Sequence, residues 1–155
     1  MPSSATSRTL DLPTETQTRV LGRKLAELAR SGDVILLEGP IGAGKSSLAR
    51  AFIRARLGAG EEVPSPTFTL VQVYDDHGTE IWHADLYRLT HPDEVWELGL
   101  DQAFATAICL VEWPDRLGSH LPPDALRIRL MTVGDGRQAL VSGGRAGLAK
   151  ALADG

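Results

Sequence analysis

Several features are scarce or missing in this sequence of 155 residues, and each shortage excludes a class of protein. The single cysteine, Cys109, rules out an internal disulfide and fits a reducing compartment. No apolar run approaches the roughly 18 residues of a membrane helix, and residues 1–8 lack the apolar core of a signal peptide. We therefore expect a cytoplasmic protein with no membrane association.

Basic charge is also scarce, since the formal net charge is −4. The densest basic cluster consists of Arg50, Arg54 and Arg56, which we interpret as the solvated face of a helix. A protein that binds nucleic acid by itself normally carries a broad basic patch. If RNA is involved, we expect other proteins to hold it.

The most informative segment that is present spans residues 39–46 and matches G-x-x-x-x-G-K-[ST], the phosphate-binding P-loop. Its glycines allow successive backbone N–H groups to face a phosphate chain, and the helix that starts inside the loop favours the same anion. Lys45, which we expect to stay within reach of solvent, would contact the β- and γ-phosphates. The Ser46 hydroxyl would ligate Mg²⁺. The loop therefore predicts binding of a nucleoside triphosphate with Mg²⁺.

The choice of base follows from another absence. GTPases recognise guanine through an Asn-Lys-x-Asp motif, and the sequence contains no asparagine. ATP is therefore the favoured nucleotide.

The surroundings of the P-loop predict the fold. An apolar strand at residues 33–38 precedes the loop, and a helix whose apolar residues recur at helical spacing follows it as far as Gly58. Before this unit the patterns predict a first strand at 8–12 and a helix from Thr14 to near Gly32. After it they predict a strand at 68–74 that turns back into a second at 79–84, a short helix at 93–98 and a strand at 107–111. A hairpin at 126–141 and a terminal helix at 145–153 complete the chain. We predict one α/β domain over residues 1–155, a three-layer P-loop NTPase fold with a mixed central sheet flanked by helices.

A P-loop requires a carboxylate that holds the Mg²⁺ shell or positions the attacking water, usually at the end of an apolar strand beside the P-loop strand. Glu112 ends the more apolar of two suitable strands, although aspartate is commoner at this position. Asp85 follows the other strand. Each could instead be an ordinary strand-end or turn residue, and we expect both to be functional.

Four further residues or segments could reach such a site. The loop Ser65–Phe68 stands where P-loop switch proteins sense the γ-phosphate, although it could be a simple proline turn. His83 is interpreted as a packed or hydrogen-bonded strand residue rather than a base. Trp113 could belong to the core or to a pocket wall. Arg137, in a glycine-rich turn, could lie over the nucleotide or be an ordinary turn residue.

Beyond the P-loop, three motifs occur in order: SPTF at 65–68, HADLYR at 83–88 and VEWP at 111–114. With the P-loop they resemble the bacterial TsaE family, the P-loop ATPases of tRNA threonylcarbamoyladenosine biosynthesis. The resemblance runs from about Leu10 to the hairpin at Arg137, and the three motifs at these separations are specific to that family. The fold that it implies agrees with the one predicted above.

The resemblance also implies a function. Members are small Mg²⁺-dependent ATPases, and we expect this one to be weak alone and stimulated by its partners, TsaB and TsaD. TsaD, with TsaB, transfers a threonylcarbamoyl group to an adenosine beside the anticodon of ANN-decoding tRNAs. ATP hydrolysis by the TsaE protein supports repeated turnover of that pair rather than the transfer itself. The resemblance also implies that this protein contacts tRNA only indirectly, through the complex.

Residue roles are implied motif by motif. Lys45 would hold phosphates, Ser46 and Glu112 would ligate Mg²⁺, and Asp85 would serve the metal or the water. Further nucleotide contacts are implied for Gly42, Ala43, Gly44, Ser47, Trp113, and, approaching from opposite sides, Glu15 and Arg137. Ser65 and Thr67 would belong to the switch loop. Many members have two threonines after the P-loop lysine, whereas this chain has Ser46 and Ser47, which keeps both hydroxyls.

Two other functions are compatible with the P-loop. A small phosphotransferase, such as a nucleoside kinase, would need an acceptor site and an arginine-bearing lid, for which Arg116, Arg127 and Arg129 are the candidates. A nucleotide-sensing adaptor that does not hydrolyse ATP would share every binding residue with the ATPase. A measured rate of hydrolysis separates the adaptor from the ATPase.

Overall fold

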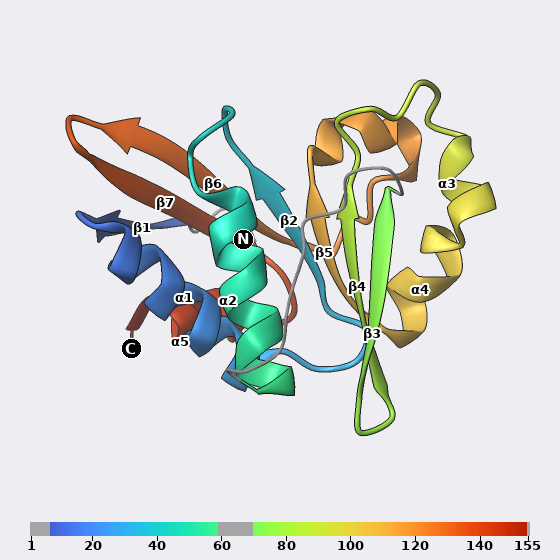
Figure 1. Cartoon of the computed structure of the whole chain (residues 1–155), viewed down its shortest axis with the longest axis horizontal. Helices are drawn as coiled ribbons and strands as arrows, with labels where there is room; N and C mark the ends of the chain where they lie inside the picture. The colour runs from blue at the N-terminus through green and yellow to red at the C-terminus, as the bar shows by residue number, and fades with distance from the viewer. Residues whose placement is uncertain (1–6, 59–69, 155) are drawn as a thin grey trace.

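The computed structural model describes residues 7–58 and 70–154. The strands are β1 (Ser7–Leu12), β2 (Val34–Glu38), β3 (Val71–Asp76), β4 (Thr79–Asp85), β5 (Ile108–Glu112), β6 (Leu126–Val133) and β7 (Gly136–Gly143). The helices are α1 (Glu15–Leu28), α2 (Lys45–Leu57), α3 (Glu94–Leu98), α4 (Leu100–Thr106), the 3₁₀ segment η2 (Pro114–His120) and α5 (Leu148–Asp154). Figure 1 shows their arrangement.

All these strands form one mixed sheet in the order β1-β7-β6-β2-β5-β4-β3. The central strands β6, β2, β5 and β4 pair in parallel, whereas β1 with β7, β7 with β6, and β4 with β3 pair antiparallel. Parallel neighbours need crossover connections, and the helices that make those crossovers cover the sheet. The predicted mixed sheet is confirmed.

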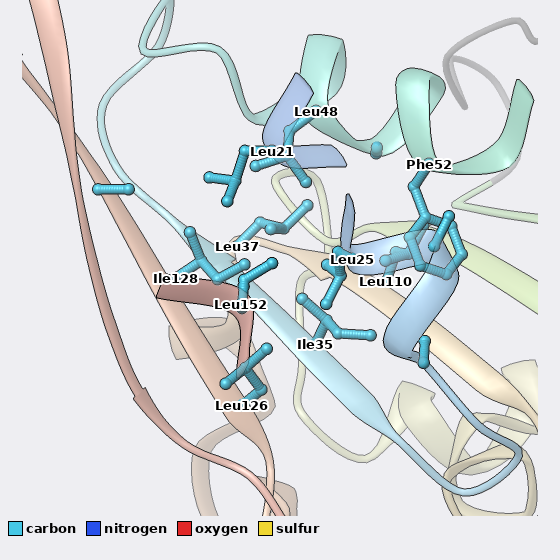
Figure 2. Packing of buried hydrophobic residues seen from close by; sticks show 14 of the residues in the cluster. Leu21, Leu25, Ile35, Leu37, Leu48, Phe52, Leu110, Leu126, Ile128 and Leu152 are labelled. Atoms are coloured by element: carbon cyan, nitrogen blue, oxygen red, sulfur yellow. The ribbon is translucent and has the colours of Figure 1, made fainter. Parts of the chain in front are cut away.

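Two apolar clusters, one on each face of the sheet, make the fold three-layered. Helices α1, α2 and α5 pack on one face (Figure 1), where alternate strand residues such as Ile35 and Leu37 are buried. Figure 2 shows part of this cluster, with Leu21, Leu25, Leu48, Phe52 and Leu152 from the helices meeting Leu110, Leu126 and Ile128 from the strands. The intervening residues, among them Val34 and Leu36, face α3, α4 and η2. Each fully buried leucine or phenylalanine contributes about 1.5–3 kcal/mol of transfer free energy.

Local signals explain where the principal helices begin and end. Thr14 caps α1, because its Oγ1 accepts a hydrogen bond from the Gln17 N–H at 3.3 Å. Helix α1 ends at Leu28, four residues before the predicted Gly32. Helix α2 ends where Gly58 adopts a φ of 122°, a conformation that glycine tolerates best. No helix in the described ranges combines the length and apolar composition needed to cross a bilayer.

Most predicted elements are present with shifted boundaries, and two were missed. The strand expected at 68–74 begins at Val71 among the described residues and continues to Asp76. Helix α4 and segment η2 were not predicted. The expectation that Arg50, Arg54 and Arg56 form a solvated face is wrong for Arg56. Its Nε lies 2.7 Å from Asp76 Oδ2, and its Nη1 donates to main-chain carbonyls near the end of α1.

The parallel strands determine where a site can form. The last residue of β5, Glu112, pairs with Leu37 of β2 and with Asp85 of β4. The carboxyl ends of these three strands therefore meet at one edge of the sheet. The P-loop leaves β2 at that same edge.

Candidate nucleotide site

The P-loop makes a tight connection between β2 and α2. Gly39 has a φ of 141°, and a side chain there would collide with the carbonyl oxygen of Leu130. Gly42 and Gly44 also have positive φ, and Gly44 is the residue from which α2 starts. Ala43 is buried, and its N–H donates to the Pro40 carbonyl at 3.1 Å. Positions 39, 42 and 44 favour glycine because residues with a side chain rarely adopt positive φ.

Lys45 is held inside the loop. Its side chain donates to the carbonyls of Gly39 and Pro40, and its Nζ lies 3.6 Å from the centre of the Trp113 ring. Only 6% of the residue is exposed, so Lys45 is less accessible than expected, although it lines the cavity over the loop. Burial lowers the pKa of the ammonium, and the carboxylates of Glu112 and Asp85 oppose that shift.

A row of hydrogen bonds joins Ser46, which follows Lys45 in the chain, to Glu112 and then to His83. Ser46 Oγ lies 2.9 Å and 3.2 Å from the two carboxylate oxygens of Glu112. His83 Nε2 lies 2.7 Å from Glu112 Oε2, and both residues are buried. The two residues expected to ligate Mg²⁺ are therefore in direct contact. The interpretation of His83 as a hydrogen-bonded strand residue is confirmed, but its partner was not foreseen.

Asp85 lies beside Glu112 at the end of β4, and its Oδ1 accepts a hydrogen bond from the Tyr87 N–H at 3.1 Å. Burial raises the pKa of Asp85, and the nearby Glu112 carboxylate raises it further, whereas the hydrogen bond from Tyr87 opposes the shift. A carboxylate with this environment is suited to accept a proton or orient a water molecule.

Trp113 has an unusual backbone conformation immediately after Glu112. Its φ of 60° and ψ of 53° lie in the left-handed region, which bulky residues seldom occupy. The ring packs against Tyr87, with centroids 5.0 Å apart, and covers the Lys45 ammonium. Trp113 lines the cavity over the loop and also packs against the apolar core, so both possibilities left by the sequence apply.

Arg137 and Glu15 approach the P-loop from different elements. Arg137, on β7, donates from Nη2 to the Gly42 carbonyl at 3.0 Å, while its buried Nε has no hydrogen-bond partner among the described residues. Glu15, on α1, accepts a hydrogen bond from Ser47 Oγ at 3.3 Å and pairs with Arg19 at 3.4 Å. Arg137 therefore contacts the P-loop itself and lines the cavity described below, whereas Glu15 contacts Ser47 of α2 and does not line that cavity along its described part. Their expected contacts with the nucleotide stay predictions.

A cavity of about 430 Å³ lies over the loop. Of the residues expected in the site, it is lined by Gly42, Gly44, Lys45, Ser46, Ser47, Asp85, Glu112, Trp113 and Arg137. Tyr87 and Arg88 of the HADLYR motif also line it, although no role in the site was expected for them. Their place directly after Asp85, where the chain leaves the strand edge, was the signal that could have identified them.

The expected switch residues Ser65 and Thr67 lie outside the described residues. The three candidate lid arginines of a phosphotransferase do not line the cavity along its described part. Arg127 and Arg129 pair with Glu38 on β2, at 3.1 Å and 3.9 Å, and Arg116 lies over the Tyr87 ring at 5.7 Å. The described residues therefore offer no arginine lid of the expected kind.

The residues that are present fit ATP and Mg²⁺. The cavity volume lies within the usual range for small-molecule sites, about 300–1,000 Å³. The Nε of Arg137, which has no partner in the described part of the chain, and the ammonium of Lys45 are suited to phosphate oxygens. Ser46, Glu112 and Asp85 offer oxygen ligands, and Mg²⁺ typically takes one or two carboxylates together with substrate phosphates. The described ranges contain no group of three or more His, Cys, Asp or Glu side chains that could hold a metal ion without such a phosphate.

Comparison with known proteins gives matches over most of the chain. The family model described as threonylcarbamoyl adenosine biosynthesis protein TsaE matches residues 12–139. Proteins named tRNA threonylcarbamoyladenosine biosynthesis protein TsaE are similar to it in Rickettsia felis (34% identity, 83% of this chain and 75% of the relative), Bacillus subtilis (38%, 77% and 74%) and Streptomyces coelicolor (40%, 76% and 81%). The crystal structure of YdiB from Bacillus subtilis superposes with a TM-score of 0.76 at 26% identity, covering 95% of this chain and 94% of that one.

Proposed function

The chain belongs to the TsaE family, and from that premise we propose that it is the Mg²⁺-dependent ATPase that supports threonylcarbamoyladenosine modification of tRNA. The observation that carries the proposal is the contact between Ser46 and Glu112 beside Lys45. In a P-loop NTPase, a loop hydroxyl and a strand-end carboxylate are the groups that hold Mg²⁺, and the loop lysine neutralises phosphate charge.

The proposed mechanism assigns each side chain a task. Lys45, which donates to the carbonyls of Gly39 and Pro40, would instead bind the β- and γ-phosphate oxygens of the nucleotide. Ser46 and Glu112 would hold Mg²⁺, which would supply charge neutralisation on those oxygens. Asp85 orients the attacking water through a hydrogen bond. The alternative assignment, in which Asp85 holds the metal, is tested below.

Three further residues enclose the nucleotide in this proposal. Arg137 adds a guanidinium on the side of β7, where its Nε has no partner among the described residues. Trp113 and Tyr87 form an aromatic wall. Removing water from the phosphates strengthens every charge interaction in the site.

We further propose that TsaB and TsaD are the partners, and that they raise the rate of hydrolysis. The formal net charge of −4 argues against tRNA as the direct activator. In P-loop enzymes, an arginine finger supplied by the chain itself or by a partner is worth about 10³ to 10⁵ in rate. We expect the isolated chain to release phosphate from ATP slowly and the TsaB–TsaD pair to stimulate it at least about tenfold, measured as steady-state phosphate release over a range of ATP concentrations.

The same assay discriminates the other functions. Fast turnover by the isolated chain, unchanged when the pair is added, would favour a phosphotransferase or an independent ATPase. Nucleotide binding without any phosphate release, even with both partners present, would favour the adaptor. Either result contradicts the proposal.

A further inference from the structure

His83 is a buried residue in direct contact with Glu112, one of the proposed metal ligands. It lies on β4 two residues before Asp85, so both residues belong to the same face of the strand. Its neighbour on β5 is Leu110, two residues before Glu112. The imidazole is fully buried, and its Nε2 lies 2.7 Å from Glu112 Oε2.

The direction of this hydrogen bond follows from the chemistry of the two groups. A carboxylate only accepts hydrogen bonds, so His83 donates through Nε2–H. The other ring nitrogen, Nδ1, is buried and has no hydrogen-bond partner within the described ranges. Buried polar atoms are normally hydrogen-bonded, so a residue that only filled the core would be expected to be apolar and not to bury an unsatisfied Nδ1. The bond to Glu112 is the interaction that accounts for a histidine at this position.

Glu112 is consequently fixed from two sides. Ser46 donates to its carboxylate from the P-loop, and His83 donates to Oε2 from β4. If His83 were absent, the Glu112 side chain, which is only 2% exposed, would have Ser46 as its one hydrogen-bond donor among the described residues. Groups that hold a metal ligand in place typically alter metal affinity about 10- to 100-fold when they are removed.

We propose that His83 is a positioning residue that fixes the Glu112 carboxylate beside Ser46 in the orientation that receives Mg²⁺. The inference rests on the proposed function, since it requires Mg²⁺ to bind with the nucleotide. It goes further because it assigns a role to a residue that touches neither metal nor nucleotide. Its hydrogen bond to the site is the one to Glu112.

The test measures binding rather than turnover. A non-hydrolysable ATP analogue is titrated into the wild type, His83→Leu and His83→Gln, once in EDTA and once over a series of Mg²⁺ concentrations. Leucine removes the donor at similar volume, whereas the glutamine amide nitrogen reaches the place of Nε2. For His83→Leu we expect the Mg²⁺ concentration at half-maximal effect to rise about tenfold or more, with unchanged affinity in EDTA. His83→Gln should recover most of the loss.

The control is Ile81→Val, which alters the preceding buried position on this face of β4 and should leave the Mg²⁺ dependence unchanged. The inference is overturned if His83→Leu keeps the wild-type Mg²⁺ dependence, if affinity falls equally with and without Mg²⁺, or if His83→Gln recovers nothing. Should His83→Leu fail to fold, His83→Asn replaces it, because its shorter amide cannot reach Glu112. A wild type with no Mg²⁺ dependence overturns the proposed metal site as well.

Discussion

Replacing Lys45 with alanine is expected to abolish useful ATP binding. The ammonium that now contacts two loop carbonyls and the Trp113 ring would be lost, and with it the charge-assisted contact to phosphate. Such contacts contribute at least about 1.5–3 kcal/mol, which corresponds to an affinity roughly 10- to 150-fold weaker. Calorimetric titration of ATP with Mg²⁺ measures this change directly.

The matched control is Lys150→Ala, which removes the same charge from an exposed position on α5 and should bind ATP like the wild type. Because Lys45 is buried, its replacement also costs some folding stability, so circular dichroism must show that the variant is folded at the temperature of the titration. Wild-type affinity in a folded Lys45→Ala protein would contradict the assignment of the P-loop.

Exchanging each of the two carboxylates should separate binding from hydrolysis. If Glu112 ligates Mg²⁺, Glu112→Gln should lose the Mg²⁺-dependent part of nucleotide affinity, by about tenfold or more, and keep the affinity measured in EDTA. If Asp85 orients water, Asp85→Asn should bind ATP normally and hydrolyse it about 10²-fold or more slowly. The measurements are titration with and without Mg²⁺ and phosphate release with the partners present.

Two surface changes serve as controls for these variants, Glu27→Gln on α1 and Asp101→Asn on α4, and neither residue lines the cavity. The opposite pattern, in which Asp85→Asn loses the Mg²⁺ effect and Glu112→Gln only stops hydrolysis, would exchange the two roles. Normal binding and hydrolysis in both variants would show that neither carboxylate serves the site.

Much of this arrangement could be predicted because strong local signals lie next to one another in the sequence. The P-loop identifies one strand and one helix, and the apolar strand that ends at Glu112 identifies a second strand. Parallel strands bring their carboxyl ends together, so the meeting of Ser46 and Glu112 was expected before the register was known.

The elements that were missed have short or contradictory signals. Gly99 indicates the end of a helix and does end α3, but α4 starts from the same residue. Helix α4 then buries only Leu100 and Ala103, too few residues for a recognisable period. The 3₁₀ segment η2 is interrupted at Gly118, whose backbone is not helical.

The side-chain contacts that were not foreseen depend on tertiary structure. Alternation along the strand places His83 on the same face as Asp85, but only the register between β4 and β5 brings it to Glu112. Lys45 was expected to be accessible because nothing in the sequence indicates that Trp113 turns into the left-handed region and covers it. A conformation that is rare for tryptophan cannot be anticipated from local preference.

The proposed function is tested most directly by counting modification events in a reconstituted system. TsaB, TsaD, tRNA and an activated threonylcarbamoyl donor are combined with this chain or with its Lys45→Ala variant, and modified adenosines are counted per TsaD molecule over time. With the wild type and ATP we expect many events per TsaD. With the variant, or with a non-hydrolysable ATP analogue, formation should stop after about one. Equal, repeated turnover in all these reactions would contradict the proposal that this chain supports modification through ATP hydrolysis.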